Sequence, residues 1–500
     1  MPQGVIMIKK YFTFSILFCL SIFVSAQTIE DKLVDRLVEY ASIYTQSEYD
    51  KDNVPSSDQQ RSLAALLAEE LTNLGAQDVY VDEHSYVYGT ITGNVQNAPT
   101  LFLSAHLDTS PDLDLQGKAP IPVVHEYNGG DLQINENLIL TEDKNQFLTA
   151  AAGGKVITSD GTTLLGGDDK AGMAVIMTIA ETLTQNPNIP HGDIRIIFTP
   201  DEEIGNSTKY LTKENIAADF GLVIDSHGFG RIVVENFNAT DFTFTVKTPS
   251  AGHPGYSSNV PPLNIATNFI SKFPEALASY NSSGKDGYLS YHKTKAVSAN
   301  EFVVYGRIRS FELNEMELYK KMVLSWAKET ARQYNMECVT VINNEKSSNS
   351  DEMFGITLEL KDSYFNSKNV LENYPTNFAL IEKAYEMAGI TMFAESGRGG
   401  SDAGDITYLG IPTYNIFGGS HNEHSADEWV SSKQMLASYN VALNYIKLMA
   451  IQNREQMLNE GQQEIKEFST NKLVERLNKR INDTLNDTEI KYGNPFSNPK

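Results

Sequence analysis

The sequence is poor in cysteine and in basic residues. Its 500 residues include only two cysteines, Cys19 and Cys338, and Cys19 lies in an N-terminal segment that we expect to be removed. A lone cysteine forms no internal disulfide, and Cys338 in "MECVTVIN" reads as a small buried residue of a strand rather than a nucleophile. The 40 basic residues face 64 acidic ones, a formal net charge of −24. This excess argues against nucleic acid or an anionic membrane as the main partner and favours solubility and cation binding.

Long hydrophobic runs are absent except at the N-terminus. There Lys9 and Lys10 precede an apolar segment from 12 to 24, which ends at the small-residue site Val-Ser-Ala. This layout predicts a secretory signal peptide over residues 1–26, and therefore a periplasmic or secreted protein. A buried N-terminal helix is the alternative, and Met7 is a second candidate start. The segment is shorter than the about 20 apolar residues of a membrane span, so we expect no integral membrane segment in the mature chain.

The composition, 41% hydrophobic and 21% charged, is typical of a soluble globular protein, and 500 residues favour two domains. Strands alternate with helices over 27–239 and again over 366–452, which predicts an α/β domain with a mixed, mostly parallel sheet flanked by helices. The intervening residues 240–365 read as an inserted α+β domain. We expect an irregular excursion over 113–163 and a polar, helical tail over 453–500.

Ionisable side chains follow five successive strands of the predicted α/β domain. They are His106 and Asp108, Asp168 and Asp169, Asp201 with Glu202 and Glu203, Asp225 with His227, and His421 with His424. Each group alone has a plain explanation, such as a helix cap or a turn. In an open α/β sheet, however, functional groups gather beyond the carboxyl ends of the strands. So many carboxylates on one rim would repel one another without a cation among them, and two divalent metal ions are the simplest compensation. Imidazole and carboxylate ligands suit zinc, with manganese or cobalt as alternatives.

The motifs that carry these residues resemble a known family. "SAHLDTSPD", "DGTTLLGGDDKAG", "PHGDIRIIFTPDEEIG", "ENFNA", "HPG", "GRGGSDAG" and "NIFGG…HSADEWV" occur in order from about Asp31 to about residue 450. With them the sequence resembles peptidase T, the tripeptide aminopeptidase family of the two-zinc aminopeptidase and carboxypeptidase superfamily. The resemblance implies the zinc exopeptidase fold, with an inserted domain of the lid or dimerisation type.

The resemblance also implies a division of labour at the site. One metal is assigned to His106 and Asp225, the other to Glu203 and His424, with Asp168 bridging them, Asp108 orienting His106, and Glu202 as the general base for a water held between the metals. Neighbouring residues of an extended backbone point to opposite sides, which suits one base and one ligand at 202 and 203. His421 remains an alternative to His424, which we prefer for the "SADEW" that follows it.

Three further residues are assigned by the same resemblance. His253 of "GHPG" would donate a hydrogen bond to the developing oxyanion, and Arg309 and Arg398 would hold a substrate carboxylate through their planar guanidinium groups. The competing interpretation is a turn histidine and two surface arginines.

The expected function is a two-metal exopeptidase that removes the N-terminal residue of short peptides, most readily tripeptides. A dipeptidase, carboxypeptidase or aminoacylase of the same superfamily is the alternative, and a non-catalytic peptide-binding protein on this fold is a second one. The resemblance allows a homodimer through the inserted domain. The export signal and the long C-terminal tail depart from the mostly cytoplasmic family pattern.

Overall fold

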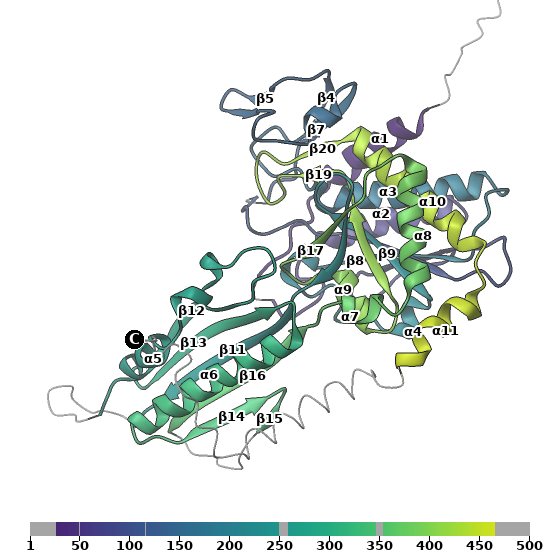
Figure 1. The fold of residues 1–500 in the computed structure, drawn as a ribbon. Coiled ribbons are helices and arrows are strands. Elements are labelled where there is room, and N and C mark those ends of the chain that lie inside the picture. Colours follow the sequence, from purple (N-terminus) through teal and green to yellow (C-terminus); the bar gives the residue numbers. More distant parts are fainter. Residues whose placement is uncertain (1–26, 50, 116, 250–258, 347–353, 466–500) are drawn as a thin grey trace, which may run out of the picture.

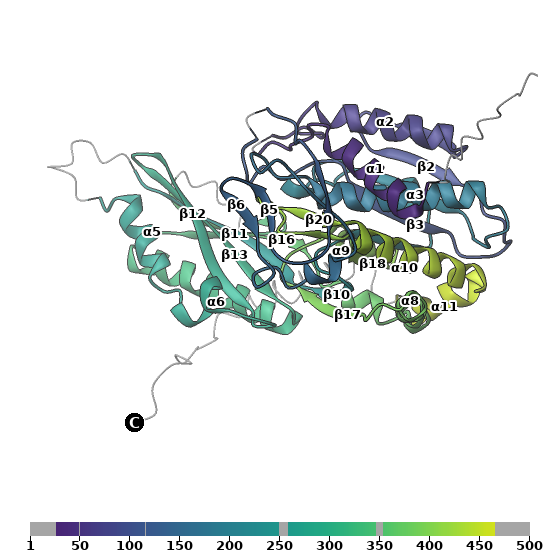
Figure 2. The same ribbon diagram turned by 90° about the horizontal axis from the view of Figure 1, so that it is seen from above.

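A computed structural model describes residues 27–49, 51–115, 117–249, 259–346 and 354–465 (Figure 1). The predicted signal peptide and His253 lie outside these residues. Two β-sheets, each covered by helices, form two bodies that lie side by side, as the view from above also shows (Figure 2).

The larger sheet belongs to the α/β body. Its eight strands lie in the order β1 (Gln77–Val81), β2 (Val87–Ile91), β8 (Ile194–Thr199), β3 (Leu101–His106), β9 (Phe220–Ser226), β18 (Thr413–Phe417), β10 (Arg231–Asn236) and β17 (Phe393–Gly397). The four central strands, from β8 to β18, are parallel, whereas β1, β2 and β8 pair antiparallel, as do β18 and β10. The sheet is therefore mixed, with a parallel centre, as predicted.

Helices cover both faces of this sheet. The elements packed into the core on one face are α1 (Ile29–Ala41), α2 (Gln60–Asn73), α3 (Gly167–Gln185), α8 (Pro375–Ala388) and α10 (Ser432–Ala450). The other face holds the short helices α4 (Lys213–Ile216) and α9 (Asp402–Tyr408), and α7 (Lys368–Leu371) leads into α8. In β3, Leu101 and Leu103 enter the first core and Phe102 the second. Burial on both faces explains why this strand reads as a continuous apolar run.

The second body is an α+β unit between β10 and α7. Its sheet has the order β12 (Tyr288–Ser298), β13 (Glu301–Ser310), β11 (Asn238–Lys247), β16 (Gly355–Tyr364), β14 (Cys338–Ile342) and β15 (Glu345–Lys346). Helices α5 (Pro262–Ile270) and α6 (Leu313–Gln333) pack into one core with these strands. The chain enters the unit at Phe237 and leaves it at Phe365. The predicted fold class, an α/β sheet with an inserted α+β domain, is thus confirmed; as independently folding units, the predicted domain ranges stay a prediction.

The expectation of an irregular excursion over 113–163 was wrong in part. This stretch contains β4 (Val123–Tyr127), β5 (Leu132–Asn135), β6 (Leu138–Leu140) and β7 (Gly154–Thr158). β7 lies between β4 and β20 (Trp429–Ser431), and β20 pairs with β19 (Ser420–His421). The strands are short, and β7 finds its partner far along the chain, which no local pattern reveals.

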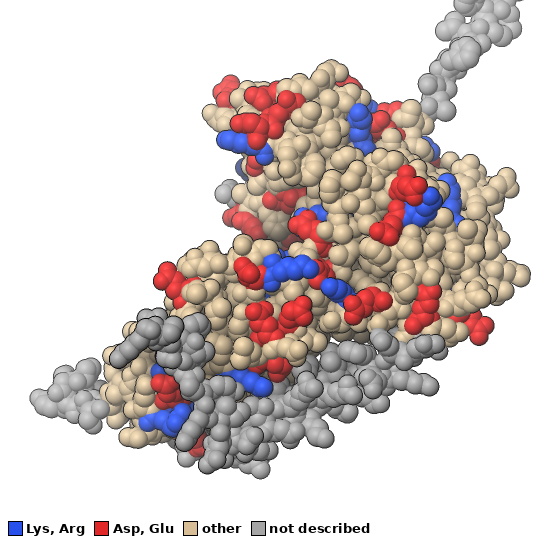
Figure 3. All heavy atoms as spheres, viewed as in Figure 1, with Lys and Arg blue, Asp and Glu red and all other residues tan. Residues whose placement is uncertain are grey.

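The chain ends, as far as it is described, in α11 (Arg454–Ile465), which packs on α8. The remainder of the predicted tail lies outside the described residues. None of the helices within the described ranges is long and apolar enough to cross a bilayer. On the face in Figure 3, acidic side chains are scattered over both bodies, and basic side chains form no continuous patch there. Burial raises the pKa of the Cys338 thiol to about 11, which makes this cysteine a poor nucleophile.

Candidate metal centre and active site

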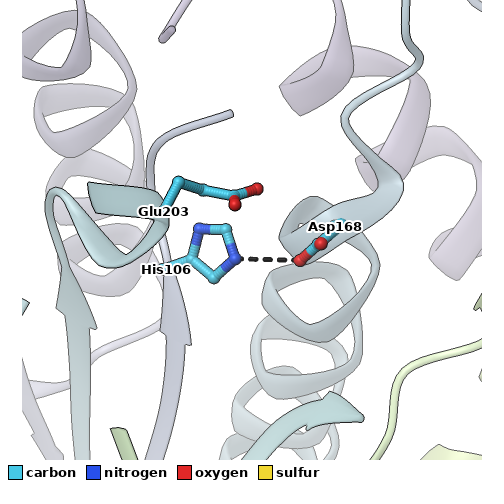
Figure 4. Close-up of side chains that lie close together, drawn as sticks. All are labelled: His106, Asp168 and Glu203. Carbon is cyan, nitrogen blue, oxygen red and sulfur yellow. Dashed lines mark hydrogen bonds and ion pairs between the residues drawn. The ribbon is translucent and has the colours of Figure 1, made fainter. Parts of the chain in front are cut away.

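The structure brings the predicted metal ligands together at one edge of the large sheet. His106 ends β3, Asp225 lies near the end of β9, and Glu203 follows β8. Because these strands are parallel, their carboxyl ends meet at the same edge. Asp168 reaches this edge from the start of α3, and His424 from the turn after β19. Two sets of side chains have ligand atoms within 4.8 Å of one another: His106, Asp168 and Glu203 (Figure 4), and His106, Asp169 and Asp225.

His106 is oriented by Asp108, as the resemblance implied. Its Nδ1 lies 3.0 Å from the backbone oxygen of Asp108 and 3.3 Å from that residue's carboxylate. These acceptors favour a proton on Nδ1, so Nε2 is the nitrogen that can bind a metal. Nε2 lies 2.9 Å from Asp168 Oδ1 and 3.6 Å from Asp225 Oδ1.

His424 faces the same carboxylate from the other side. Its Nε2 lies 2.9 Å from Glu203 Oε2 and 3.4 Å from Asp168 Oδ2. The two oxygens of Asp168 thus face different imidazoles, the disposition required of a ligand shared by two metals. His424 Nδ1 lies 2.9 Å from Asp112 Oδ2, an orienting partner that sequence reasoning missed.

His421 takes a structural position instead. Its Nε2 lies 2.6 Å from Gln434 Oε1, and its ring stacks on Trp429 with centroids 4.1 Å apart. The structure therefore brings His424, rather than His421, to the other predicted ligands. Asp169 is also occupied elsewhere, since its carboxylate accepts backbone N–H groups of His106 and Gly172.

The turn that carries Glu202 and Glu203 is held by buried carboxylates. Asp108 accepts the backbone N–H of Glu202 at 3.0 Å and that of Glu203 at 3.2 Å. Asp402 accepts the hydroxyls of Thr199 and Ser207, which lie on either side of the turn. Asp108 therefore positions both His106 and the predicted base.

A cavity of about 260 Å³ opens beside these residues. It is lined by Asp168, Glu202, Glu203, Asp225 and His424, together with Arg398 and residues 399–401. His227 and Arg231 also line it, although no role was predicted for them. The Arg231 side chain pairs with Glu395 and donates to the backbone oxygen of His227 at 3.4 Å. Neither partner lies close in sequence to a predicted motif, which is why Arg231 escaped prediction.

The charges at this edge do not balance within the chain. Burial raises the pKa of Glu203 and of Asp225 to about 7 each, and the neighbouring charge of Asp168 raises both further. Burial also raises the pKa of Glu202, with Asp402 as the largest charged contributor. Hydrogen bonds to Asp168 and Glu203 raise the pKa of His424 to about 12. Too many carboxylates thus share two imidazoles.

The residues present fit a pair of divalent cations. Glu203 Oε1 is buried and has no hydrogen-bond partner among the described residues. An oxygen of this kind normally has a partner, and a cation is the partner that an excess of carboxylates calls for. His106 with Asp225, and Glu203 with His424, would hold the two ions, with Asp168 between them.

The two predicted substrate-binding arginines lie in different settings. Arg398 lines the cavity, and its guanidinium donates to Ser282 Oγ at 2.7 Å and to the backbone oxygen of Gly284 at 2.6 Å. Arg309 lies in β13, only 6% exposed, and donates to the backbone oxygen of Ile308. It is not among the described residues that line the cavity, so its contact with substrate stays a prediction, as does the role of His253.

Fold and ligand set together define a metal-dependent hydrolase of the α/β class. A model of the family described as "Peptidase family M20/M25/M40" matches residues 161–448, and the chain belongs to this family.

Named relatives agree with this assignment. The chain is 35% identical to a peptidase T of Halothermothrix orenii over 429 residues, which cover 84% of this chain and 99% of the relative. It is 33% identical to a peptidase T of Shewanella pealeana, with the same coverage. Among solved structures, it has a TM-score of 0.60 to the aminopeptidase PepT of Bacillus cereus and 0.61 to a tripeptidase of Staphylococcus aureus. Both are 22% identical and are covered to 99%, with 84% and 85% of this chain matched. These structures establish the fold.

Proposed function

We propose that this protein is a metal-dependent aminopeptidase that hydrolyses the N-terminal peptide bond of tripeptides. The observation that carries the proposal is the convergence of Glu202 and the five predicted ligands on one cavity. Relatives named peptidase T, matched over nearly their whole length, support the choice of substrate.

The side chains around the cavity divide the work. Two divalent ions bound here polarise the scissile carbonyl and lower the pKa of a water molecule. Glu202 borders the cavity, with its backbone held by Asp108, and its carboxylate can take a proton from water and return it to the departing amine. Arg398 presents a planar guanidinium, steadied by Ser282 and Gly284, to a substrate carboxylate. We propose zinc as the metal, and activity after reloading the metal-free protein with zinc, manganese or cobalt tests that choice.

A pair of matched peptides tests the exopeptidase assignment. We expect Ala-Ala-Ala to be cleaved to alanine and Ala-Ala, and its N-acetylated form to be left intact. Equal cleavage of the blocked peptide would exclude an aminopeptidase and favour an aminoacylase or a carboxypeptidase. A panel of di-, tri- and tetrapeptides separates a tripeptidase from a dipeptidase.

We also propose that the protein is exported through residues 1–26. The support is the sequence pattern of two lysines, an apolar run and a small-residue site. Expression in a Gram-negative host, followed by N-terminal sequencing, should give a periplasmic chain that begins at Gln27. A full-length chain in the cytoplasmic fraction would contradict export.

A homodimer through the inserted domain is the last part of the proposal. β12 is an edge strand of eleven residues, mostly exposed, with Tyr291 and Val297 each nearly half exposed. Such an edge can pair with a second copy. Sedimentation velocity should show a dimer that Tyr291→Lys with Val297→Lys dissociates, whereas Ile139→Lys, an exposed apolar residue on β6, leaves it intact. A monomeric wild type would end this part of the proposal.

A further inference from the structure

Glu428 is a buried carboxylate that the roles described so far do not use. It directly precedes β20 and follows His424 by four residues. Its exposed fraction is 1%, and it does not line the cavity. Within the described residues it has no ion-pair partner at 4.0 Å or less. A buried anion in such a position needs strong hydrogen-bond donors to remain stable.

Backbone amides of the turn before α3 supply those donors. Oε2 of Glu428 accepts the N–H of Leu165 at 2.8 Å and that of Gly166 at 2.7 Å. Oε1 accepts the N–H of Asp168 at 3.0 Å. One carboxylate thus holds three of the four residues that lead up to, and include, the ligand between the two imidazoles.

The local sequence makes room for this contact. A Cβ on Gly167 would lie 3.1 Å from Glu428 Oε1 and 2.3 Å from a methyl carbon of Val430. Gly166 has φ of +78°, a conformation that side chains rarely adopt. The pair of glycines therefore lets the backbone of the turn come close to β20 and expose its N–H groups to the carboxylate.

The same carboxylate connects the turn to the segment that carries His424. His424 Nε2 lies 3.4 Å from Asp168 Oδ2, and Glu428 ties the backbones of both residues together from behind. A contact that served stability alone would be met as well by apolar packing, because an unpaired buried charge is costly. The position of the contact at the shared ligand points to a role in the metal centre.

We propose that Glu428 is a positioning residue of the two-metal centre, which sets Asp168 in place between the two ions through the backbone of residues 165–168 and keeps it in register with His424. The inference rests on the proposed function, because it concerns the same metal site. It predicts that loss of the carboxylate weakens metal binding before it affects anything else.

Calorimetric titration of zinc or cobalt into chelator-treated full-length protein tests this. Glu428→Gln has nearly the same volume but turns an N–H donor toward backbone donors. We expect about 10- to 100-fold weaker metal binding, the range found for groups that orient ligands, together with an altered visible spectrum of bound cobalt. In the loaded variant, kcat should fall while KM stays close to that of the wild type. Glu428→Asp keeps the charge and should recover part of the affinity.

Asp219→Asn is the matched control. Asp219 is also a buried carboxylate that accepts a backbone N–H, from Thr100 at 2.8 Å, but it pairs with Arg454 far from the cavity. Its loss should lower the melting temperature of the metal-free protein without changing metal affinity. If Glu428→Gln does not fold, Glu428→Asp carries the test.

Wild-type metal affinity and cobalt spectrum in the Glu428 variant that folds would overturn the inference. A wild type that binds two ions but cleaves no tripeptide would instead overturn the proposed function and leave the inference standing.

Discussion

Buried charges are arranged differently in the two bodies of this protein. In the inserted domain, Lys320 is 3% exposed, and its ammonium lies 2.6 Å from Asp362 and 3.0 Å from Glu317. At the edge of the large sheet, carboxylates outnumber the cations that face them, and Glu203 keeps an oxygen without a partner in the described part of the chain. A buried charge that finds its partner within the chain serves the fold. A surplus of one sign, concentrated at strand ends, is the mark of a site that receives ions from outside.

The sharpest break of this comparison is the replacement of Glu202 by glutamine. Glu202 lines the cavity but is not needed to hold either ion, so we expect kcat to fall about 100- to 10,000-fold while two metal ions remain bound. Peptide hydrolysis and metal analysis on the same sample measure both quantities. Glu386→Gln, an exposed carboxylate on α8, serves as the control. Wild-type turnover in Glu202→Gln would remove the assigned base.

In the inserted domain, the expected effect is on stability instead. Lys320→Met leaves Asp362 buried without its cation, and such a loss costs about 3–5 kcal/mol. Differential scanning calorimetry should show a lower melting temperature, and titration should show unchanged metal affinity. Adding Asp362→Leu should recover part of the stability, because the unpaired charge is then gone. Weakened metal binding in Lys320→Met would blur the distinction between the two bodies.

Much of the site could be predicted because its residues follow apolar strands directly. His106 and Asp225 come at the ends of runs that are buried on both faces, and parallel strands bring their ends together. Asp112 was missed because its partner His424 lies 312 residues away in sequence.

The lobe around β7 was missed for the same reason, since β7 pairs with β20 across the chain. Helix α1 was not among the expected elements, although its residues Leu33 and Leu37 enter the core. Local patterns predict elements and strand ends, whereas contacts between distant loops follow only from the folded chain.

A third, smaller effect sharpens the comparison within the α/β body itself. Glu181 on α3 pairs with Lys32 at 2.5 Å and with Arg36 at 2.9 Å, away from the metal centre. Partial burial by itself raises the pKa of Glu181, but these ion pairs outweigh it and lower the pKa below its ordinary value. A lowered pKa in the folded state means that the ionised group stabilises the fold above the pKa of the unfolded chain, near 4.3, and loses that effect as the pH falls through the folded value.

We therefore expect Glu181→Gln to cost about 1–3 kcal/mol at pH 7, between the values for exposed and buried pairs. Melting temperatures of variant and wild type should converge as the pH falls below about 4. A gap that stays constant from pH 7 to pH 3 would show that the charge of Glu181 contributes nothing.

The central claim is that two divalent cations balance the carboxylates at the edge of the large sheet. Calorimetric titration of zinc into chelator-treated wild-type protein, checked by metal analysis after dialysis, tests it most directly. The account predicts two ions per chain and a higher melting temperature in the loaded protein, because ligands that bind only the folded state stabilise it. A chain that binds no ion, or whose melting temperature does not respond to zinc, would contradict it.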